Sequence, residues 1–215
     1  MKIAIIGNGG HSKVIQDIID SIEGNQIIGY FDDMYKKLEL KNNIYFGPVL
    51  SIKEIMNESY EFKIVISIGE NKVRKSIAQK LSISNEYYAT FIHKSAIVSS
   101  SAKIGYGTVV MPNVVINADT KIGNHAIINT SAVVEHDNSI GDFVHVSPNA
   151  TLTGSVSIED GAHIGAGATI IPDINIGKWA KIGAGATVIH NIPSYCTAAG
   201  VPAKVKNKQS KRMEV

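Results

Sequence analysis

One periodicity constrains the fold of this chain more than any other feature. From residue 92 onward, every sixth residue is Ile, Val or Leu, at seventeen consecutive positions and without an insertion. We call these residues the anchors; they are Ile92, Val98, Ile104, Val110, Ile116, Ile122, Ile128, Val134, Ile140, Val146, Leu152, Ile158, Ile164, Ile170, Ile176, Ile182 and Val188. Such a run does not arise by chance, so it reports a structural repeat.

A period of six matches neither the 3.6 residues of an α-helix turn nor the heptad of a coiled coil. It fits short parallel strands separated by tight turns, three to a coil, each placing one apolar side chain inside. The residue four places after an anchor is usually small or β-branched, with exceptions at Asn138, Ile174 and Ile192. Glycine often follows an anchor directly, and we expect these glycines to adopt the backbone angles of the corners.

This pattern resembles the hexapeptide repeat of the left-handed parallel β-helix, which we expect over residues 91–192. A solenoid without catalytic activity would explain the repeat equally well. Residues 193–215 contain several basic residues and are expected to form a tail, as a loop or short helix leaving the solenoid. The basic residues are Lys204, Lys206, Lys208, Lys211 and Arg212.

Residues 1–90 lack the period and predict a different fold. Apolar runs predict three strands, and helical spacing of apolar residues predicts a helix from His11 to Ile22 and another through Val73, Ile77 and Leu81. The predicted strands span 2–6, 26–31 and 63–68. Alternating strands and helices indicate an α/β, Rossmann-like βαβ domain with a parallel sheet.

Candidate binding residues cluster at the carboxyl ends of these strands, where parallel sheets bind ligands. The turn from Gly7 to Ser12 opens a helix, whose N–H groups suit a phosphate. Ser12 replaces the third glycine of the dinucleotide fingerprint, which disfavours NAD. With the acidic pair after the second strand, this turn favours a nucleotide ligand over the alternative of plain solvated turns. The candidates are Gly9, Gly10, Asp32, Asp33 and Gly69.

Histidines within the repeat are the candidates for chemistry. His136 stands out because Asp137 follows it, and a carboxylate beside an imidazole fixes its tautomer and raises its basicity. His145 and His163 are three repeats apart, which is one full coil, and therefore stack in adjacent coils. A solvent-facing histidine at a corner is the alternative for each.

Composition excludes several classes of protein. The chain has 215 residues with 21 Lys and Arg against 19 Asp and Glu, which argues against a nucleic-acid or anionic-membrane binder. No apolar segment approaches the ~20 residues of a membrane span, and the run from Ile3 to Ile6 is too short for a signal peptide. The single Cys196 fits a spectator thiol in a reducing compartment. We expect a cytoplasmic protein.

Nearly the whole chain resembles the bacterial sugar O/N-acetyltransferase family, which includes sialic-acid O-acetyltransferases and UDP-4-amino-sugar N-acetyltransferases. The resemblance rests on the segments Ile5–His11, Phe31–Asp33, Ile66–Gly69, Asn129–Asp137, Phe143–Ser147 and Gly200–Lys204. It implies a homotrimer with acetyl-CoA in the groove between neighbouring β-helices, and a nucleotide-sugar substrate.

The resemblance also implies roles for individual residues. His136 matches the general base, supported by Asp137, where the amino-sugar enzymes often have Glu. His145 matches an acetyl-CoA contact, with Gly154, Ala166 and Ala184 further along the same groove. The nucleotide-sugar contacts match Gly9, Gly10, His11, Asp32, Asp33 and Gly69, and Asn129 is a further candidate beside the base. Lys204 and Lys206 either lie near a CoA phosphate or are solvated.

The resulting hypothesis is an acetyl-CoA-dependent N-acetyltransferase acting on the 4-amino group of a nucleotide-linked sugar for surface glycans, with UDP the expected carrier. The alternative within the family is O-acetylation of sialic acid or another sugar. From other classes, a zinc hydratase and a non-catalytic nucleotide-sugar-binding scaffold remain open. No metal is expected, because His136, His145 and His163 lack the close i, i+5 pair of the hexapeptide zinc hydratases.

Overall fold

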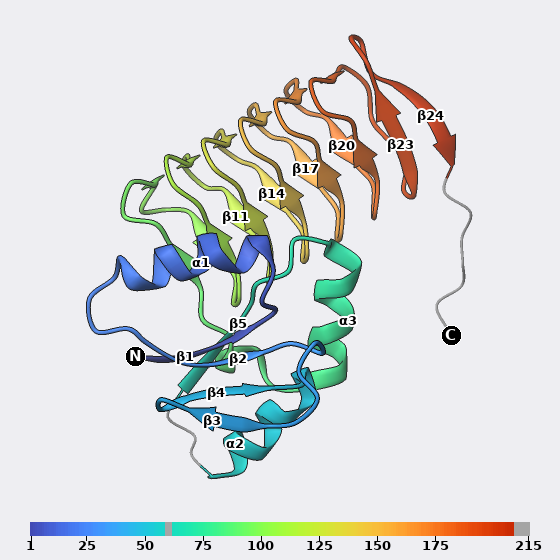
Figure 1. Cartoon of the computed structure of the whole chain (residues 1–215). Helices are drawn as coiled ribbons and strands as arrows, with labels where there is room; N and C mark the ends of the chain where they lie inside the picture. The colour runs from blue at the N-terminus through green and yellow to red at the C-terminus, as the bar shows by residue number, and fades with distance from the viewer. Residues whose placement is uncertain (59–61, 209–215) are drawn as a thin grey trace.

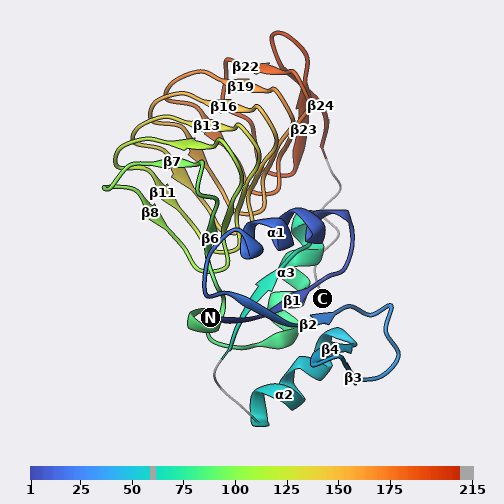
Figure 2. The ribbon, with the colours of Figure 1, turned by 60° about the vertical axis from the view of Figure 1, so that its left-hand side comes forward.

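The computed structural model describes residues 1–58 and 62–208. It consists of an α/β domain and a stack of short coils that rises beside it (Figure 1). Turned by 60°, the stack shows its successive coils and the α/β domain below its first turns (Figure 2). Within the described part of the chain, no helix has the length and apolar character needed to cross a membrane.

The α/β domain is built on a five-stranded sheet in the order β3-β4-β2-β1-β5. The strands are β1 (Lys2–Ile6), β2 (Gln26–Phe31), β3 (Glu39–Lys41), β4 (Ile44–Gly47) and β5 (Phe62–Ile66). Strand β1 pairs in parallel with β2 and β5, and β4 extends the parallel sheet from β2. The expected Rossmann-like domain is confirmed, with an additional antiparallel edge strand, β3.

Helices cover both faces of this sheet. They are α1 (Gly10–Asp20), α2 (Ile52–Glu58) and α3 (Asn71–Leu81), with short 3₁₀ turns at Val49–Ser51 and Asn85–Tyr87. Helix α1 lies between the sheet and the coils (Figure 1). Its Ile15, Ile18 and Ile19 share one continuous apolar core with the coil interior. A second core on the other face contains Ile77 and Leu81 of α3. The two domains are therefore joined by buried apolar surface.

The coils form the expected left-handed parallel β-helix. All seventeen anchors occupy the second position of a two-residue strand, and strands that are three repeats apart pair in parallel. The strands are β6 (Phe91–Ile92), β7 (Ile97–Val98), β8 (Lys103–Ile104), β9 (Val109–Val110), β10 (Val115–Ile116), β11 (Lys121–Ile122), β12 (Ile127–Ile128), β13 (Val133–Val134), β14 (Ser139–Ile140), β15 (His145–Val146), β16 (Thr151–Leu152), β17 (Ser157–Ile158), β18 (His163–Ile164), β19 (Thr169–Ile170), β20 (Asn175–Ile176), β21 (Lys181–Ile182) and β22 (Thr187–Val188).

These strands form the three sides of a prism. We call the sheet that begins with β6 and β9 the docking sheet, because the α/β domain packs against it. The second sheet consists of β7, β10, β13, β16, β19 and β22. The third sheet consists of β8, β11, β14, β17 and β20. The number of residues between a given residue and the nearest anchor in the sequence therefore determines whether it lies on a side of the prism or at a corner.

The expected role of the glycines after the anchors was wrong. The left-handed backbone angles occur three residues after an anchor, at positions such as Asn113, Asp119 and Asp137, where Asn and Asp tolerate them. Glycines directly after anchors are needed for close approach of coils instead. A Cβ on Gly105 would lie 2.6 Å from the backbone of Gly123 in the next coil.

The expected loop or short helix after residue 193 was also wrong. Strand β23 (Cys196–Ala199) continues the docking sheet next to β21, and β24 (Lys204–Lys208) pairs antiparallel with β23. The side chains of Lys204 and Lys206 are exposed on this final strand, and Cys196 is buried. Lys211 and Arg212 lie outside the described residues.

Candidate active site

Three glycines in the loops at the carboxyl edge of the α/β sheet have no other atoms packed where a side chain would lie. A Cβ placed on Gly9, Gly10 or Gly69 would meet no atom within 4 Å. Gly9 is also the N-cap residue of α1, and no side chain there forms a capping hydrogen bond with the first backbone N–H groups of the helix. The helix start is therefore free to receive the polar groups of a ligand.

The acidic pair holds these loops in place. Asp32 accepts hydrogen bonds from the backbone N–H of Asn8 (2.8 Å) and of Met34 (2.9 Å). Asp33 accepts one from the N–H of Val49 (3.1 Å). The expected carboxylates thus lie at the predicted edge, where they stabilise loop conformation.

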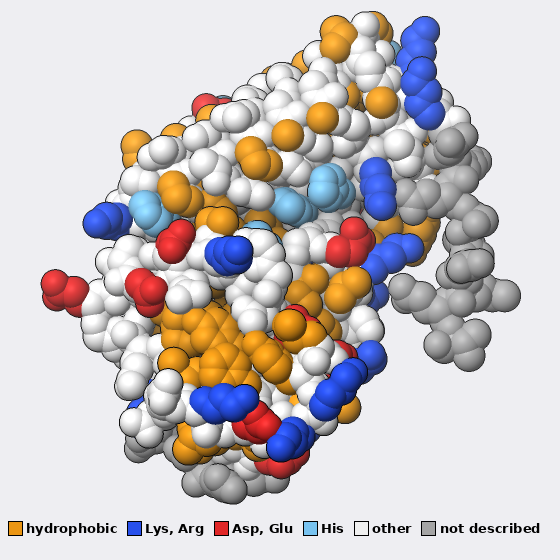
Figure 3. Space-filling view, in the orientation of Figure 1, with side chains coloured by type: hydrophobic (Ala, Val, Ile, Leu, Met, Phe, Trp, Pro, Cys, Tyr) orange, Lys and Arg blue, Asp and Glu red, His pale blue; other side chains and the backbone are white. Residues whose placement is uncertain are grey.

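Three imidazoles form a row where the α/β domain meets the docking sheet. The ring centroids of His11 and His145 are 6.5 Å apart, and those of His145 and His163 are 4.9 Å apart. Burial lowers the pKa of His145 to about 3 and that of His11 to about 4, with a smaller contribution to each from the Arg74 charge. Pale-blue histidine side chains lie along this boundary in Figure 3. These histidines are neutral at physiological pH.

The histidine row reflects which residues point outward from the docking sheet in successive coils. The paired positions change from Phe91, Val109 and Ile127 in the first coils to His145 and His163 in the next ones. The first three are buried, and the two histidines are partly accessible. The change from apolar to polar residues therefore marks where the outer face of the docking sheet is no longer fully buried.

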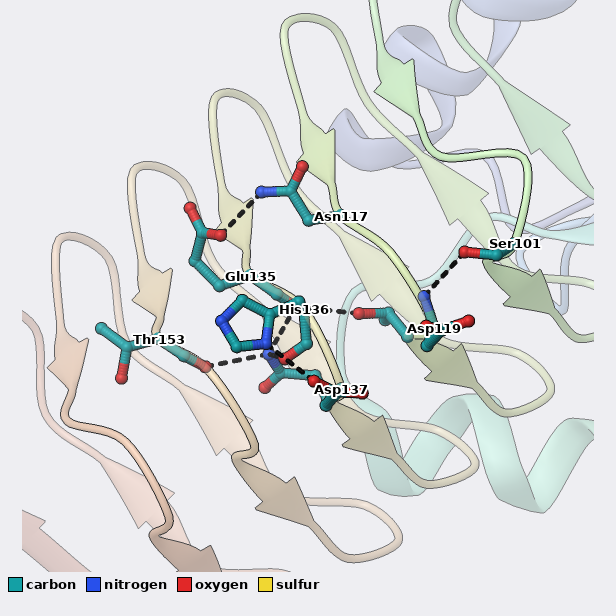
Figure 4. A network of polar contacts seen from close by, with 9 residues as sticks. Ser101, Asn117, Asp119, Glu135, His136, Asp137 and Thr153 are labelled. Atoms are coloured by element: carbon teal, nitrogen blue, oxygen red, sulfur yellow. Dashed lines mark hydrogen bonds and ion pairs between the residues drawn. The ribbon is translucent and has the colours of Figure 1, made fainter.

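The candidate base lies elsewhere on the prism. His136 follows β13 at the corner between the second and third sheets, which is the corner opposite the docking sheet. Its Nδ1 lies 2.8 Å from an Oδ of Asp137, and both side chains are exposed. The hydrogen bond to Asp137 raises the pKa of His136, with a smaller contribution from the Glu135 charge. Figure 4 shows this pair projecting from the corner.

The neighbouring coil shapes the space that the His136 ring occupies. Gly154 lies at the equivalent position of the next coil, and a Cβ there would come within 2.7 Å of the imidazole Cε1. The conformation of the corner depends on buried Asn138, whose Nδ2 donates to the carbonyls of Glu135 (2.6 Å) and Thr153 (2.9 Å). Asn138 breaks the small-residue rule of the repeat, so the sequence contained a signal for this role.

The expected acetyl-CoA and substrate residues separate into two groups within one chain. Gly154 belongs to the His136 corner. Ala166 and Ala184 are exposed and stack on each other at the corner between the docking and second sheets, where the N–H of Gly185 donates to the carbonyl of Ala166 (2.8 Å). Asn129, expected beside the base, instead lies with its Nδ2 3.0 Å from Nε2 of His145.

Arg74 is a buried residue of this region that the sequence interpretation missed. It bonds the loop at Gly69 to the β-helix. A signal existed, because Asn71, Arg74 and Leu81 share the inward stripe of α3. Among the residues that the structure describes, no three His, Cys, Asp or Glu side chains are grouped so that they could hold a metal ion.

An α/β domain with open glycine loops, joined to a hexapeptide β-helix that displays a histidine–carboxylate pair, defines a class of acyltransferase. Residues 2–81 match the family model described as PglD N-terminal domain. Residues 139–172 and 155–190 match the model described as bacterial transferase hexapeptide (six repeats). The chain belongs to the bacterial sugar acetyltransferase family that combines these two parts.

Individual relatives agree with this family. A histidine-to-asparagine mutant of perosamine N-acetyltransferase from Caulobacter crescentus, in complex with CoA and GDP-perosamine, is 35% identical with a TM-score of 0.86, covering 96% of this chain and 97% of that one. The acetyltransferase domain of PglB from Neisseria gonorrhoeae FA1090, in complex with acetyl coenzyme A, is 33% identical with a TM-score of 0.82, covering 95% and 98%.

A curated relative is the UDP-N-acetylbacillosamine N-acetyltransferase of Bacillus subtilis (strain 168). It is 47% identical over 106 residues. The match spans about half of each chain, 49% of both.

Proposed function

We propose that this protein transfers the acetyl group of acetyl-CoA to the 4-amino group of a nucleotide-linked amino sugar destined for surface glycans. The observation that carries the proposal is the His136–Asp137 pair, exposed at a corner where an outside substrate can reach it. The relatives support the reaction class, because two of them are named as N-acetyltransferases and the perosamine N-acetyltransferase was solved with CoA and GDP-perosamine.

The geometry at His136 suits a general base. If Nδ1–H donates to Asp137, Nε2 carries the lone pair and faces outward from the corner. As the amine nitrogen attacks the thioester carbonyl, Nε2 takes its proton, the C–S bond breaks and the CoA thiolate leaves with a proton from the imidazolium. Products are the N-acetyl sugar and CoA. Asp137 stabilises the imidazolium formed in this step.

Substrates are placed by the remaining candidates. The open loops at Gly9, Gly10 and Gly69, held by Asp32 and Asp33, are proposed to receive the nucleotide sugar, with His11 beside them. The exposed Ala166 and Ala184 leave backbone accessible for the pantetheine chain of acetyl-CoA, next to Asn129 and His145.

The working unit is proposed to be a homotrimer. In one chain, His136 lies at the corner opposite the sheet that carries His145 and the α/β domain. A site that needs both must combine the corner of one subunit with the docking sheet of a neighbour. A closed ring of three copies provides such head-to-tail contacts. We place this unit in the cytoplasm, where acetyl-CoA is available.

Acetyl transfer to a panel of acceptors tests the function. Thiol release from acetyl-CoA is measured with UDP-, GDP- and dTDP-linked 4-amino sugars, and with free sialic acid as the contrasting acceptor. We expect turnover with an amino-sugar nucleotide and a loss of about 10²- to 10⁴-fold in His136→Ala. Turnover with sialic acid alone would favour O-acetylation. Near wild-type activity of His136→Ala would refute the role of His136 as general base. Nucleotide binding by the wild-type protein without any turnover would favour a non-catalytic scaffold.

A further inference from the structure

The first turn of α3 bonds directly to the β-helix through two buried polar side chains, Asn71 and Arg74. Arg74 is 1% exposed and Asn71 is 4% exposed. Residues three apart in a helix lie on one face, so both point toward the coils. Neither has a role in the reaction described above.

Arg74 connects the substrate-side loop to two coils. Its Nε donates to the carbonyl of His125 (2.7 Å), and one Nη donates to the carbonyl of Phe143 (2.9 Å). The other Nη donates to the carbonyls of Ile68 (2.8 Å) and Gly69 (3.2 Å). The planar fork of a guanidinium can reach such divergent acceptors, whereas a lysine ammonium cannot reach all of them.

Asn71 extends this contact to a third coil. Its Oδ1 accepts from Arg74 (3.0 Å), and its Nδ2 donates to the carbonyl of Gly161 (3.2 Å). His125, Phe143 and Gly161 are each separated by one full coil, so they occupy the same corner in three consecutive coils. The loop at Gly69 is therefore fixed in register with the coil stack.

The Gly69 carbonyl also contacts the site, because Nδ1 of His145 lies 3.3 Å from it. A carbonyl only accepts, so Nδ1 of His145 carries the hydrogen and Nε2 of the neutral ring accepts. The N–H of Thr130 donates to Oδ1 of Asn129 (2.8 Å), which fixes the amide and turns its Nδ2 toward Nε2 of His145 (3.0 Å). Every donor in this chain of bonds meets an acceptor.

We propose that Arg74 is a positioning residue for acetyl transfer: by fixing the Gly69 carbonyl it selects the Nδ1–H tautomer of His145 and so directs the Asn129 amide into the site. In the other tautomer, Nε2–H of His145 would face an N–H of Asn129, and the amide would have to turn and lose its bond from Thr130. The kinetic part of this inference rests on the proposed function.

The tautomer is measured by ¹⁵N chemical shifts of histidine-labelled protein at pH 7, with the His145 signals assigned by their absence in His145→Gln. We expect wild-type His145 to be protonated on Nδ1 only. Arg74→Lys keeps the charge but loses the fork, and its His145 is expected to populate the Nε2–H form. Ile77→Ala is the matched control, because it removes buried apolar contacts of α3 away from Gly69.

Kinetics supply the second readout. In Arg74→Lys we expect KM for the nucleotide sugar and for acetyl-CoA to rise roughly tenfold or more, as misplaced contacts do, whereas Ile77→Ala keeps both within about twofold. A wild-type His145 protonated on Nε2 overturns the inference, even if Arg74→Lys does not fold. So does a folded Arg74→Lys with unchanged tautomer and KM. Failure of the proposed function would abolish turnover in the wild type but leave the tautomer result standing.

Discussion

At the scale of single residues, the fold gives two imidazoles of the candidate site opposite properties. Burial between the domains keeps His145 neutral by lowering its pKa to about 3. His136 is exposed, and its hydrogen bond to Asp137 raises its pKa. A permanently neutral ring suits a fixed hydrogen-bond role, while a solvated ring with a raised pKa suits proton transfer. Environment therefore separates the two roles.

The contribution of Asp137 is testable through the pH–rate profile. The base must be neutral, so activity rises with pH through the pKa of His136. In Asp137→Asn the anionic acceptor is lost and this pKa falls, so the acid limb of kcat/KM should move to lower pH. The plateau should fall by about tenfold, because a less basic imidazole is a weaker catalyst. An acid limb at the wild-type position would show that Asp137 does not tune the base.

At the scale of secondary-structure elements, the repeat could be predicted almost completely. The anchors from Val110 to Val188 are buried in the coil interior, whereas Ile92, Val98 and Ile104 of the first coil are partly exposed. One inward residue every six positions admits only one register of strand and corner. The strands Lys2–Ile6 and Gln26–Phe31 were also predicted with their observed bounds. The hairpin of β3 and β4 was missed, because Glu39–Lys41 is short and polar, although the Asn42–Asn43 turn, with both residues at positive φ, was a signal.

Contacts between neighbouring coils could not be predicted from the sequence. Periodicity places Gly154 in the column of His136, but only coordinates show that its missing Cβ leaves room for the ring. Similarly, the sequence could not predict which side of the prism receives the α/β domain, nor that Arg74 bonds to carbonyls of separate coils. Every residue has a backbone carbonyl, so the pattern of side chains does not indicate which carbonyls accept these hydrogen bonds.

The stacking of Gly154 on His136 leads to a prediction for Gly154→Ala. The new Cβ would lie 2.7 Å from the imidazole, and the exposed ring can move away, so the fold should persist while the base is displaced. We expect kcat to fall by roughly 10²-fold, the loss that an ångström-scale misplacement produces, with little change in Tm. Ser100→Ala is the control for a small change of side chain, because Ser100 is exposed at the equivalent corner position two coils before His136. Unchanged kcat in Gly154→Ala would mean that the ring position in this structure does not matter for catalysis.

At the scale of the whole molecule, the two groups of candidate residues lie on different sides of the prism. The His136 corner and the docking sheet are parts of one rigid prism, since the coils are hydrogen-bonded strand to strand along its length. The apolar core shared with α1 fixes the α/β domain on the same prism. Bending cannot bring His136 to His145 within a chain, so the site proposed above needs a second copy to supply one of its two parts.

Mixed oligomers test this division. His136→Ala removes the corner part and Asn129→Ala the docking-sheet part, so each variant alone should be inactive. When the two are co-expressed with different tags and the mixed oligomers purified, an interface is intact if an unaltered corner meets an unaltered docking sheet. In a ring of three with two copies of one variant and one of the other, this occurs at one of the three interfaces, and activity should return to about a third of wild type. If each chain held a whole site, mixing would restore nothing, because every chain carries one lesion; the split site, and the trimer proposed from it, would then be wrong.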